Sequence, residues 1–270
     1  MPKKQKTTTL IVMAVLIVLL IVGIVLTGGK TEHSETVREM MRDAVLHDTN
    51  RIDFLGIMDV SPALVSAYVV TGLILLMALI IRIFVIPKFK EVPGKFQILL
   101  ETWVGFFDDL AKSYSPHRNS FLSAYIFAAG SYIFLGTLFE LLGLQAITTR
   151  GESITLGAPL ADINSAIGMG VFSYLMILTG GIAGNGFKGI LKTLKEFSLP
   201  ISMSFRLFGA LLSGLLVTEL VYYYIHLSFV LPVAVGVMFT LLHAIIQTYV
   251  LTMLVSNYYG EVSEVPEKKA

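Results

Sequence analysis

Residues 220–260 contain no Asp, Glu, Lys or Arg, and they form the longest of several uncharged apolar runs in this chain of 270 residues. About 20 apolar residues in a helix are enough to cross the hydrocarbon core of a bilayer. Only 14% of all residues are charged, whereas a soluble domain has about 25%. Too few charges remain to coat a water-soluble surface, so the sequence predicts an all-α integral membrane protein.

Five to six segments are long and apolar enough to be transmembrane helices. The first follows three lysines and is either a retained anchor or a cleaved signal peptide. The segments are residues 10–26, 63–81, 121–139, 163–187, 197–225 and a last helix of about 25 residues that ends near residue 260. The chain therefore divides into an anchor or signal peptide (1–29), an external polar segment (30–61), expected to form a short helix and a loop, and a membrane domain (62–270).

Lys and Arg are distributed unevenly between the loops. If the N-terminus is inside, most of them fall in cytoplasmic segments, in particular 82–119 and 188–195. Cytoplasmic loops are enriched in Lys and Arg, so the sequence predicts a multi-pass protein with its C-terminus in the cytoplasm. Residues 93–114 place Trp103 and other apolar residues at helical spacing, which predicts an amphipathic helix on the cytoplasmic membrane surface or against a partner subunit.

Several function classes are excluded or disfavoured by composition. The absence of Cys excludes thiolate metal sites and cysteine nucleophiles, and a net charge of +1 gives no reason to expect nucleic acid. No nucleotide-binding loop is present, and the Gly-rich residues 180–186 lack the Gly-Lys-Ser/Thr ending of a phosphate loop. These glycines are typical of a close-packed helix end and turn. We expect no cofactor and no metal site.

Arg206 is the sharpest feature, because it lies within a predicted span. An arginine at the centre of a membrane costs about 2.5–3.5 kcal/mol and cannot lose its charge. One interpretation is a side chain that snorkels to the cytoplasmic edge. Gly209, Ala210 and Ser213 lie near the same helix face, however, and small residues allow another helix to approach closely. The pattern favours a cation presented to a partner.

Further polar residues fall toward the external half of the predicted topology. His243 and Gln247 share one face of the last helix, and Glu219 lies about 20 Å along the axis from Arg206. Glu140 and Asp162 stand at the external ends of two spans. Packing through interhelical hydrogen bonds and interfacial acids are the plain interpretations. Together these residues match an aqueous half-channel for a cation.

Residues 200–209, Pro-Ile-Ser-Met-Ser-Phe-Arg-Leu-Phe-Gly, resemble the signature of subunit a of the membrane (Fo) sector of F-type ATP synthases. Residues 159–164, Pro-Leu-Ala-Asp-Ile-Asn, resemble the family's entry to the fourth helix. Further similarities are the Lys-Gly turn at 186–189, Gln247 in the last helix, and Pro93, Gln97 and Glu101 in the surface helix. The resemblance covers about residues 45–262.

The resemblance implies the static half of a rotary motor that is not itself catalytic. The hairpin of the last two helices would pack on a ring of c subunits, with Gly209, Ala210 and Ser213 facing it and Arg206 as the essential charge. Two offset half-channels would carry H⁺, with Na⁺ left open, through a path whose members are Glu219, His243, Gln247, Asp162, Glu140 and Asn164. Ser202, Ser204, Gln247 and Asn257 would line the cytoplasmic side. Partners would include b-type peripheral stalk subunits, other ATP synthase subunits and the lipid of a bacterial-type inner membrane.

The sequence departs from the family pattern at a few positions. Ala210 stands where an Asn is usual, and Leu215 stands where an acidic residue or His is usual, with Glu219 one turn further along. Glu140 occupies a region where Asn is typical, and His243 lies about one turn nearer Gln247 than expected. Two alternatives remain at this point: a six-span secondary transporter that binds a small anion at Arg206, and a membrane scaffold whose polar residues serve packing.

Overall fold

The computed structural model describes residues 52–54, 58–147, 149, 153–223 and 231–264, together with isolated positions between 14 and 42. The long helices are α3 (Pro62–Ile80), α4 (Lys95–Tyr114), α5 (Ser120–Phe139), α6 (Ile163–Asn185), α8 (Ser198–Tyr223) and α9 (Leu231–Ser263). Shorter elements are β1 (Ile52–Phe54), β2 (Met58–Val60), η1 (Ile81–Val85), η2 (Ile86–Lys88), η3 (Glu140–Leu142), β3 (Gln145–Ile147), β4 (Ser153–Thr155), η4 (Pro159–Ala161) and α7 (Phe187–Lys195).

Five of the described helices are long and apolar enough to cross a membrane, which confirms the predicted all-helical membrane fold. The spans are Pro62–Lys88, Ser120–Leu142, Ile163–Asn185, Ser198–Thr218 and Val233–Ser263. The predicted first span, residues 10–26, lies for the most part outside the described residues, as does most of the polar segment 30–61. Helix α9 has 33 residues and is longer than the expected 25 or so, since it runs past Gly260 and Glu261 to Ser263.

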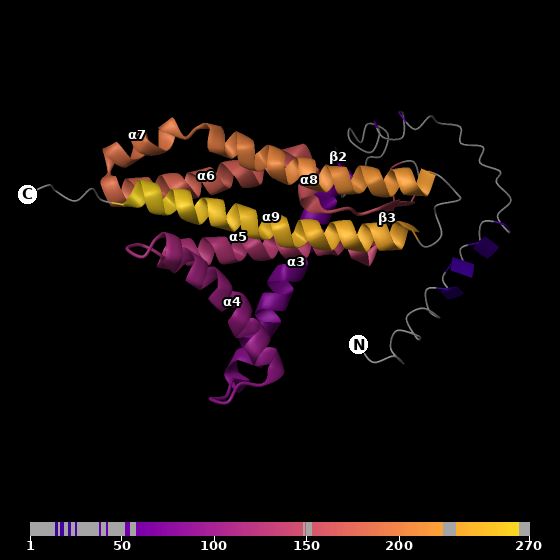
Figure 1. Ribbon diagram of the computed structural model, residues 1–270, viewed down its shortest axis with the longest axis horizontal. Coiled ribbons are helices and arrows are strands. Elements are labelled where there is room, and N and C mark those ends of the chain that lie inside the picture. The colour runs from indigo at the N-terminus through magenta and orange to yellow at the C-terminus, as the bar shows by residue number, and fades with distance from the viewer. Residues whose placement is uncertain are drawn as a thin grey trace, which may run out of the picture.

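Helices α5, α6, α8 and α9 lie side by side, with α9 in contact with the other three (Figure 1). Their facing sides form the main core, which includes Ile126, Ile177, Leu207 and Val255. Helix α3 diverges from this layer and meets the start of α4 at the far tip (Figure 1). Only 6% of the most apolar window of α3 is buried, against 44% for α5, so α3 is a peripheral helix.

The amphipathic helix predicted over 93–114 is observed as α4. Phe107 and Ala111 are fully buried against the core, whereas Lys95, Glu101, Asp109 and Lys112 are exposed. The Trp103 indole N–H donates to Ser131 Oγ of α5 over 3.0 Å, and Ser123 Oγ of α5 donates to Asp108 over 3.0 Å. These two bonds tie the surface helix to the span that follows it.

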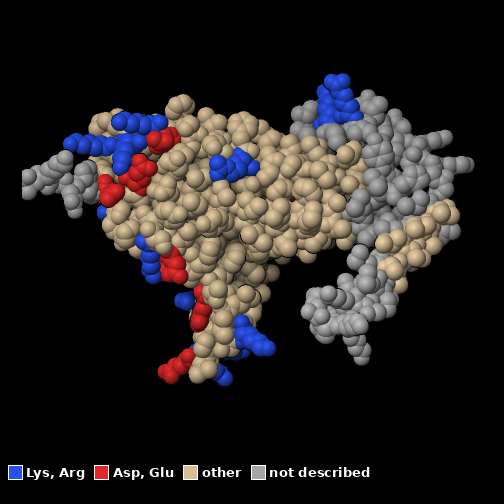
Figure 2. All heavy atoms as spheres, in the orientation of Figure 1, with Lys and Arg blue, Asp and Glu red and all other residues tan. Residues whose placement is uncertain are grey.

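Charged side chains gather at one end of the helical layer and at the tip where α3 meets α4, and a wide uncharged surface lies between (Figure 2). This distribution suits a protein whose central band faces lipid, because charged groups avoid the hydrocarbon core.

Glycines allow the helices to approach closely at several points. A Cβ on Gly170 of α6 would meet Ser204 Oγ and lie 2.8 Å from the Pro200 carbonyl oxygen of α8. Gly181 packs in the same way on Gly189 of α7. Gly186, between α6 and α7, has a φ of 57°, a left-handed conformation that glycine adopts readily. The helix end and turn expected over 180–186 are therefore present.

Three short features were not predicted. Residues 52–60, within the segment expected to form only a helix and a loop, contain the antiparallel pair β1–β2, in which Ile52 lies opposite Val60 and both are buried. A second pair, β3–β4, joins α5 to η4, with Gln145 opposite Thr155. The third is α7, whose apolar and lysine positions both recur at helical spacing.

We predict that Gly181→Ala lowers the free energy of unfolding by about 1–3 kcal/mol, the usual cost of overpacking. The new methyl group would lie 2.7 Å from Thr193 Oγ1 and 2.9 Å from the Gly189 carbonyl oxygen. Thermal unfolding of the purified protein in detergent measures the change. Gly168→Ala in the same helix is the control, because no atom lies within 4 Å of its added Cβ, and it should be neutral or slightly stabilising. Equal midpoints for the two variants would contradict the close α6–α7 contact.

Candidate functional site

Helix α8 has two different faces. Met203, Leu207 and Leu211 are buried on the side that packs in the core, and Ser204 Oγ on that side donates to the Pro200 carbonyl over 2.7 Å. Arg206 lies on the other side and is exposed. The packing of α8 on α6 therefore determines where this arginine points.

The small residues predicted beside Arg206 lie where the helical spacing places them. Gly209 and Ser213 are exposed and Ala210 is half-buried. No atom lies within 4 Å of a Cβ built on Gly209, and Ser213 Oγ donates to the Ala210 carbonyl of its own helix over 2.7 Å. Within the described part of the chain this face is smooth and uncovered.

Arg206 is the only Lys or Arg in the four helices α5, α6, α8 and α9. Among the residues that the structure describes, no carboxylate lies within ion-pair distance of Arg206. The ion pair observed among these residues joins Lys112 and Asp108 of α4. A permanent cation in a membrane span needs a polar or anionic partner, and the described chain does not supply one.

The contact made by His243 fixes how far the polar residues of α9 lie from Arg206 along the paired helices α8 and α9. Its Nδ1 lies 3.3 Å from the position of a Cβ on Gly214, so α8 and α9 touch at this pair. The two helices run antiparallel (Figure 1). Arg206 lies eight residues before Gly214 in α8, and Leu251 lies eight residues after His243 in α9. Because the helices are antiparallel, Arg206 and Leu251 are about level. Gln247 is then about 6 Å, and His243 about 12 Å, from the level of Arg206.

Gln247 is 6% exposed, and its Oε1 has no hydrogen-bond partner among the described residues. Buried polar atoms in proteins are nearly always hydrogen-bonded, and an exception calls for an explanation such as water or an ion. An acceptor one helical turn from His243 and close to the level of Arg206 therefore marks a place for a polar guest.

Glu140 and Asp162 lie toward the same end of the helices as His243. Gly130 of α5 contacts Thr248 and Thr252 of α9, and ten residues of antiparallel helix bring Glu140 about level with residues 238–242. Gly180 of α6 contacts Tyr259, and eighteen residues of parallel helix bring Asp162 about level with Leu241. Glu140 is half-buried in η3, which touches α9.

Asp162 also has a structural role. It is the N-cap of α6, and its Oδ1 accepts hydrogen bonds from the backbone N–H groups of Asn164, over 2.8 Å, and Ser165, over 3.2 Å. The Asn164 side chain is exposed on the first turn. The motif at 159–164 therefore begins a helix, whatever else its carboxylate does.

The remaining predicted residues are placed less completely. Glu219 lies in the last part of α8, thirteen residues from Arg206, and its side chain is outside the described residues. Ser202 and Asn257 are exposed on α8 and α9 respectively. Among the described residues, no group of three or more His, Cys, Asp or Glu lies close enough to hold a metal ion.

Helix α7 carries Lys188, Lys192 and Lys195, and we call the end of the helical layer where it lies the lysine-rich end. Sequence reasoning missed the hydrogen bonds that hold this end together. Asn185 Nδ2 donates to the carbonyls of Val262 and Glu264 over 2.8 Å each, and Lys192 Nζ donates to the Glu261 carbonyl. These bonds join the turn between α6 and α7 to the end of α9. No spacing rule could have revealed them, because they join side chains to backbone carbonyls about 70–80 residues away.

A family model described as ATP synthase A chain matches residues 66–260. The matched range begins within α3 and ends within α9, and it includes all the helices between them. Arg206, His243 and the cap at Asp162 lie inside it.

We predict that Asp162→Ala lowers the free energy of unfolding by about 1 kcal/mol, because two amide groups at the start of α6 lose their acceptor. Asp162→Asn is the matched variant, since Asn is an equally good N-cap, and it should unfold at nearly the wild-type temperature. Differential scanning calorimetry of the detergent-solubilised protein measures the unfolding temperatures of the two variants. A stability loss as large in the Asn variant as in the Ala variant would show that the charge, and not the cap, stabilises this end.

Proposed function

The chain belongs to the ATP synthase A chain family and is subunit a, the non-catalytic, ion-translocating stator of the Fo sector, and we propose that Arg206 is the fixed charge around which it works. It is a multi-pass membrane protein of the ATP synthase complex. The observation that carries the proposal is a permanent cation on a smooth, uncovered helix face, with no anionic partner among the described residues.

We propose that the missing anion belongs to the c-subunit ring. Gly209, Ala210 and Ser213 would let a ring helix approach the α8 face closely. Each ring carboxylate would meet Arg206 as it passes, and an adjacent cation lowers the pKa of a carboxyl group and so favours release of its ion. Because arginine keeps its charge at physiological pH, it would also repel cations that attempt to pass directly between the two sides.

One half-channel would lie on the side of Arg206 toward the C-terminal end of α8. Glu140, Asp162 and His243 come from three different helices and lie at similar levels, and the backbone of Glu219 lies about 20 Å beyond Arg206. We propose that these groups, with Asn164 at the entrance, pass an ion inward to Gln247. The partnerless Oε1 of Gln247 supports water at the inner end of this path.

The second half-channel would open at the lysine-rich end. Ser202 and Asn257 are exposed there and can contact water. Ser204 is a weaker candidate than its neighbours, since its hydroxyl already donates to the Pro200 carbonyl and packs on Gly170.

The remaining proposals concern the setting. The lysine-rich end and the C-terminus would lie in the cytoplasm of a bacterial-type cell, in accordance with the distribution of basic residues. Partners would include the c-ring and b-type stalk subunits, and the coupling ion would be H⁺, with Na⁺ as the alternative. Because the chain belongs to the ATP synthase A chain family, the secondary transporter considered earlier is excluded.

We predict that Arg206→Ala abolishes ATP-driven ion transport in the assembled complex, because the ring carboxylates lose the cation that makes them release ions. Transport in inverted vesicles and subunit composition after purification are the two measurements. Lys195→Ala removes an exposed base of α7 outside the span and should transport normally. Coupled transport at the wild-type rate in the Arg206→Ala complex would refute the assigned role.

We predict that Glu219→Gln slows transport by about tenfold or more but leaves it coupled to ATP hydrolysis, because one proton-relaying group is lost while Arg206 remains. The ratio of ions moved to ATP hydrolysed should therefore stay constant. Glu261→Gln, at the other end of α9, is the matched control, since Lys192 bonds only the backbone carbonyl of that residue. An unchanged rate in Glu219→Gln would remove this residue from the path.

A further inference from the structure

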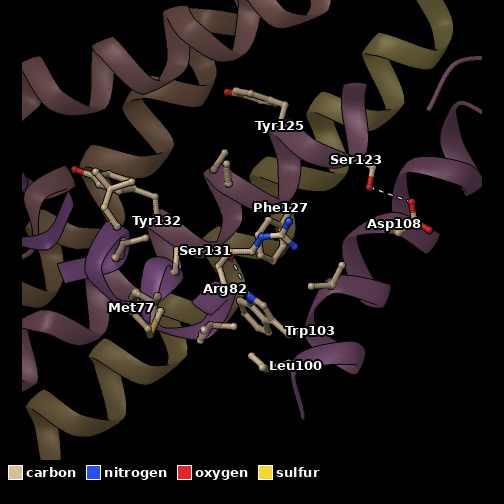
Figure 3. Close-up of a pocket in the computed structure, with 18 of the residues that line it drawn as sticks. Met77, Arg82, Leu100, Trp103, Asp108, Ser123, Tyr125, Phe127, Ser131 and Tyr132 are labelled. Atoms are coloured by element: carbon tan, nitrogen blue, oxygen red, sulfur yellow. Dashed lines mark hydrogen bonds between the residues drawn. The ribbon is translucent and has the colours of Figure 1, made fainter. Parts of the chain in front are cut away.

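A large cavity lies between α3, α4 and α5, well away from Arg206. It measures about 1050 Å³ and is lined mostly by apolar side chains, among them Leu75, Val104 and Leu135. It occupies the angle in which α3 and α4 diverge (Figure 1), and α5 forms its floor (Figure 3). Its volume is at the upper end of the range for pockets that bind small molecules.

Three charged residues line the cavity, and two of them have partners within the chain. Glu101 Oε1 accepts from Gln97 Nε2 over 2.8 Å. Asp108 forms an ion pair with Lys112 at 2.5 Å and accepts from Ser123 over 3.0 Å. These bonds to Lys112 and Ser123 hold the pKa of Asp108 below its usual value, so this carboxylate is charged and already neutralised by a neighbour.

Arg82 is the third charged residue, and it has no ion-pair or hydrogen-bond partner among the described residues. It lies in η1, where the end of α3 widens into a π-helical turn before Pro87. Figure 3 shows its side chain reaching into the cavity, on the side of Ser131 and Phe127. A cation therefore faces an apolar cavity and lacks an anion.

The position of Arg82 along the membrane axis identifies the missing anion. It lies twenty residues after Pro62, the first residue of α3, which corresponds to about 30 Å of helix and thus to the full thickness of the hydrocarbon core. If α3 crosses the bilayer along its own axis with Pro62 at the opposite face, the guanidinium would lie at the depth of lipid headgroups. Trp103, also in the lining, is of the residue type enriched at that interface.

We propose that this cavity binds one anionic phospholipid, with its phosphate on Arg82 and its acyl chains along the apolar surfaces of α3 and α5. The shared depth of cation and phosphate, together with the apolar space beside them, makes a lipid the occupant of matching charge. Basic pockets between transmembrane helices are known to hold anionic headgroups. The site is distinct from the ion path and does not depend on the function proposed for Arg206.

Trp103 provides a direct test, because it is the only Trp in the 270 residues and it lines the cavity. The full chain is reconstituted in phosphatidylcholine vesicles that contain increasing fractions of brominated phosphatidylglycerol or brominated phosphatidylcholine. Bromine quenches Trp fluorescence only at close range. Half-maximal quenching should require about fivefold less phosphatidylglycerol than phosphatidylcholine, as expected for one basic residue near a membrane surface. Equal quenching by the two lipids would overturn the proposal.

Two variants separate the headgroup site from the space for the chains. Arg82→Gln should remove the preference for phosphatidylglycerol, whereas Lys188→Gln, an exposed base outside the cavity, should retain it. Gly105→Leu places a side chain in the cavity, where no atom lies within 4 Å of the new Cβ, and should weaken quenching by both lipids. Gly72→Leu, on α3 but outside the lining, is its control. A preference that survives Arg82→Gln would overturn the assignment.

The intact complex provides a second measurement that does not depend on reconstitution of the isolated chain. Phosphatidylglycerol retained per purified ATP synthase, measured by mass spectrometry, should fall in both Arg82→Gln and Gly105→Leu complexes and stay unchanged in the two controls. Unchanged retention in both variants would overturn the lipid site in the assembled enzyme.

Discussion

The structure depends on one electrostatic constraint, which is the permanent charge of Arg206 within a membrane span. Such a cation costs several kcal/mol unless an anion or water meets it, and the described chain leaves it exposed and without an anion. The rest of α8 serves to hold it in that position. Leu207 and Leu211 are buried in the core, and the close contact of Ser204 with Gly170 fixes the rotation of the helix. In the proposed function, this cost would favour binding of a partner ring that supplies the anion.

Rigid helix packing fixes the order of the polar residues along the packed helices α5, α6, α8 and α9. Contacts at Gly130, Gly180 and Gly214 fix how far α5, α6 and α8 are shifted relative to α9. As a consequence Glu140, Asp162 and His243, which are far apart in the sequence, lie at similar levels. An ion path needs groups at defined separations, and backbone contacts between helices provide them more reliably than flexible side chains, because packed interiors resist small displacements. In the proposed ion path, Gly130, Gly180 and Gly214 would therefore contribute to function without touching the ion.

Most of the fold could be predicted from the sequence because bilayer thickness imposes it. The apolar runs at 63–81, 121–139 and 163–187 correspond to α3, α5 and α6 within a few residues. The exposed face with Arg206 followed from helical spacing alone. The two strand pairs were missed because strands of three residues are too short to show a period. Helix α7 does show helical spacing, but over only nine residues between two predicted spans. The cavity beside Arg82 could not be predicted, since the angle between α3 and α4 is set by tertiary packing on α5.

Because Asp162 caps α6, its carboxylate can play only a limited part in the proposed ion path. Two backbone amides occupy Oδ1, so the carboxylate is held in one orientation, with one oxygen left for an ion. Such a group can bind at an entrance but cannot swing between neighbours. His243 is only half-buried against Gly214 and can both accept and donate a proton. In the proposed path, transfer of the ion toward Arg206 would therefore fall to His243 and Gln247 of α9. Asp162 caps the start of α6 and would bind the ion at the entrance.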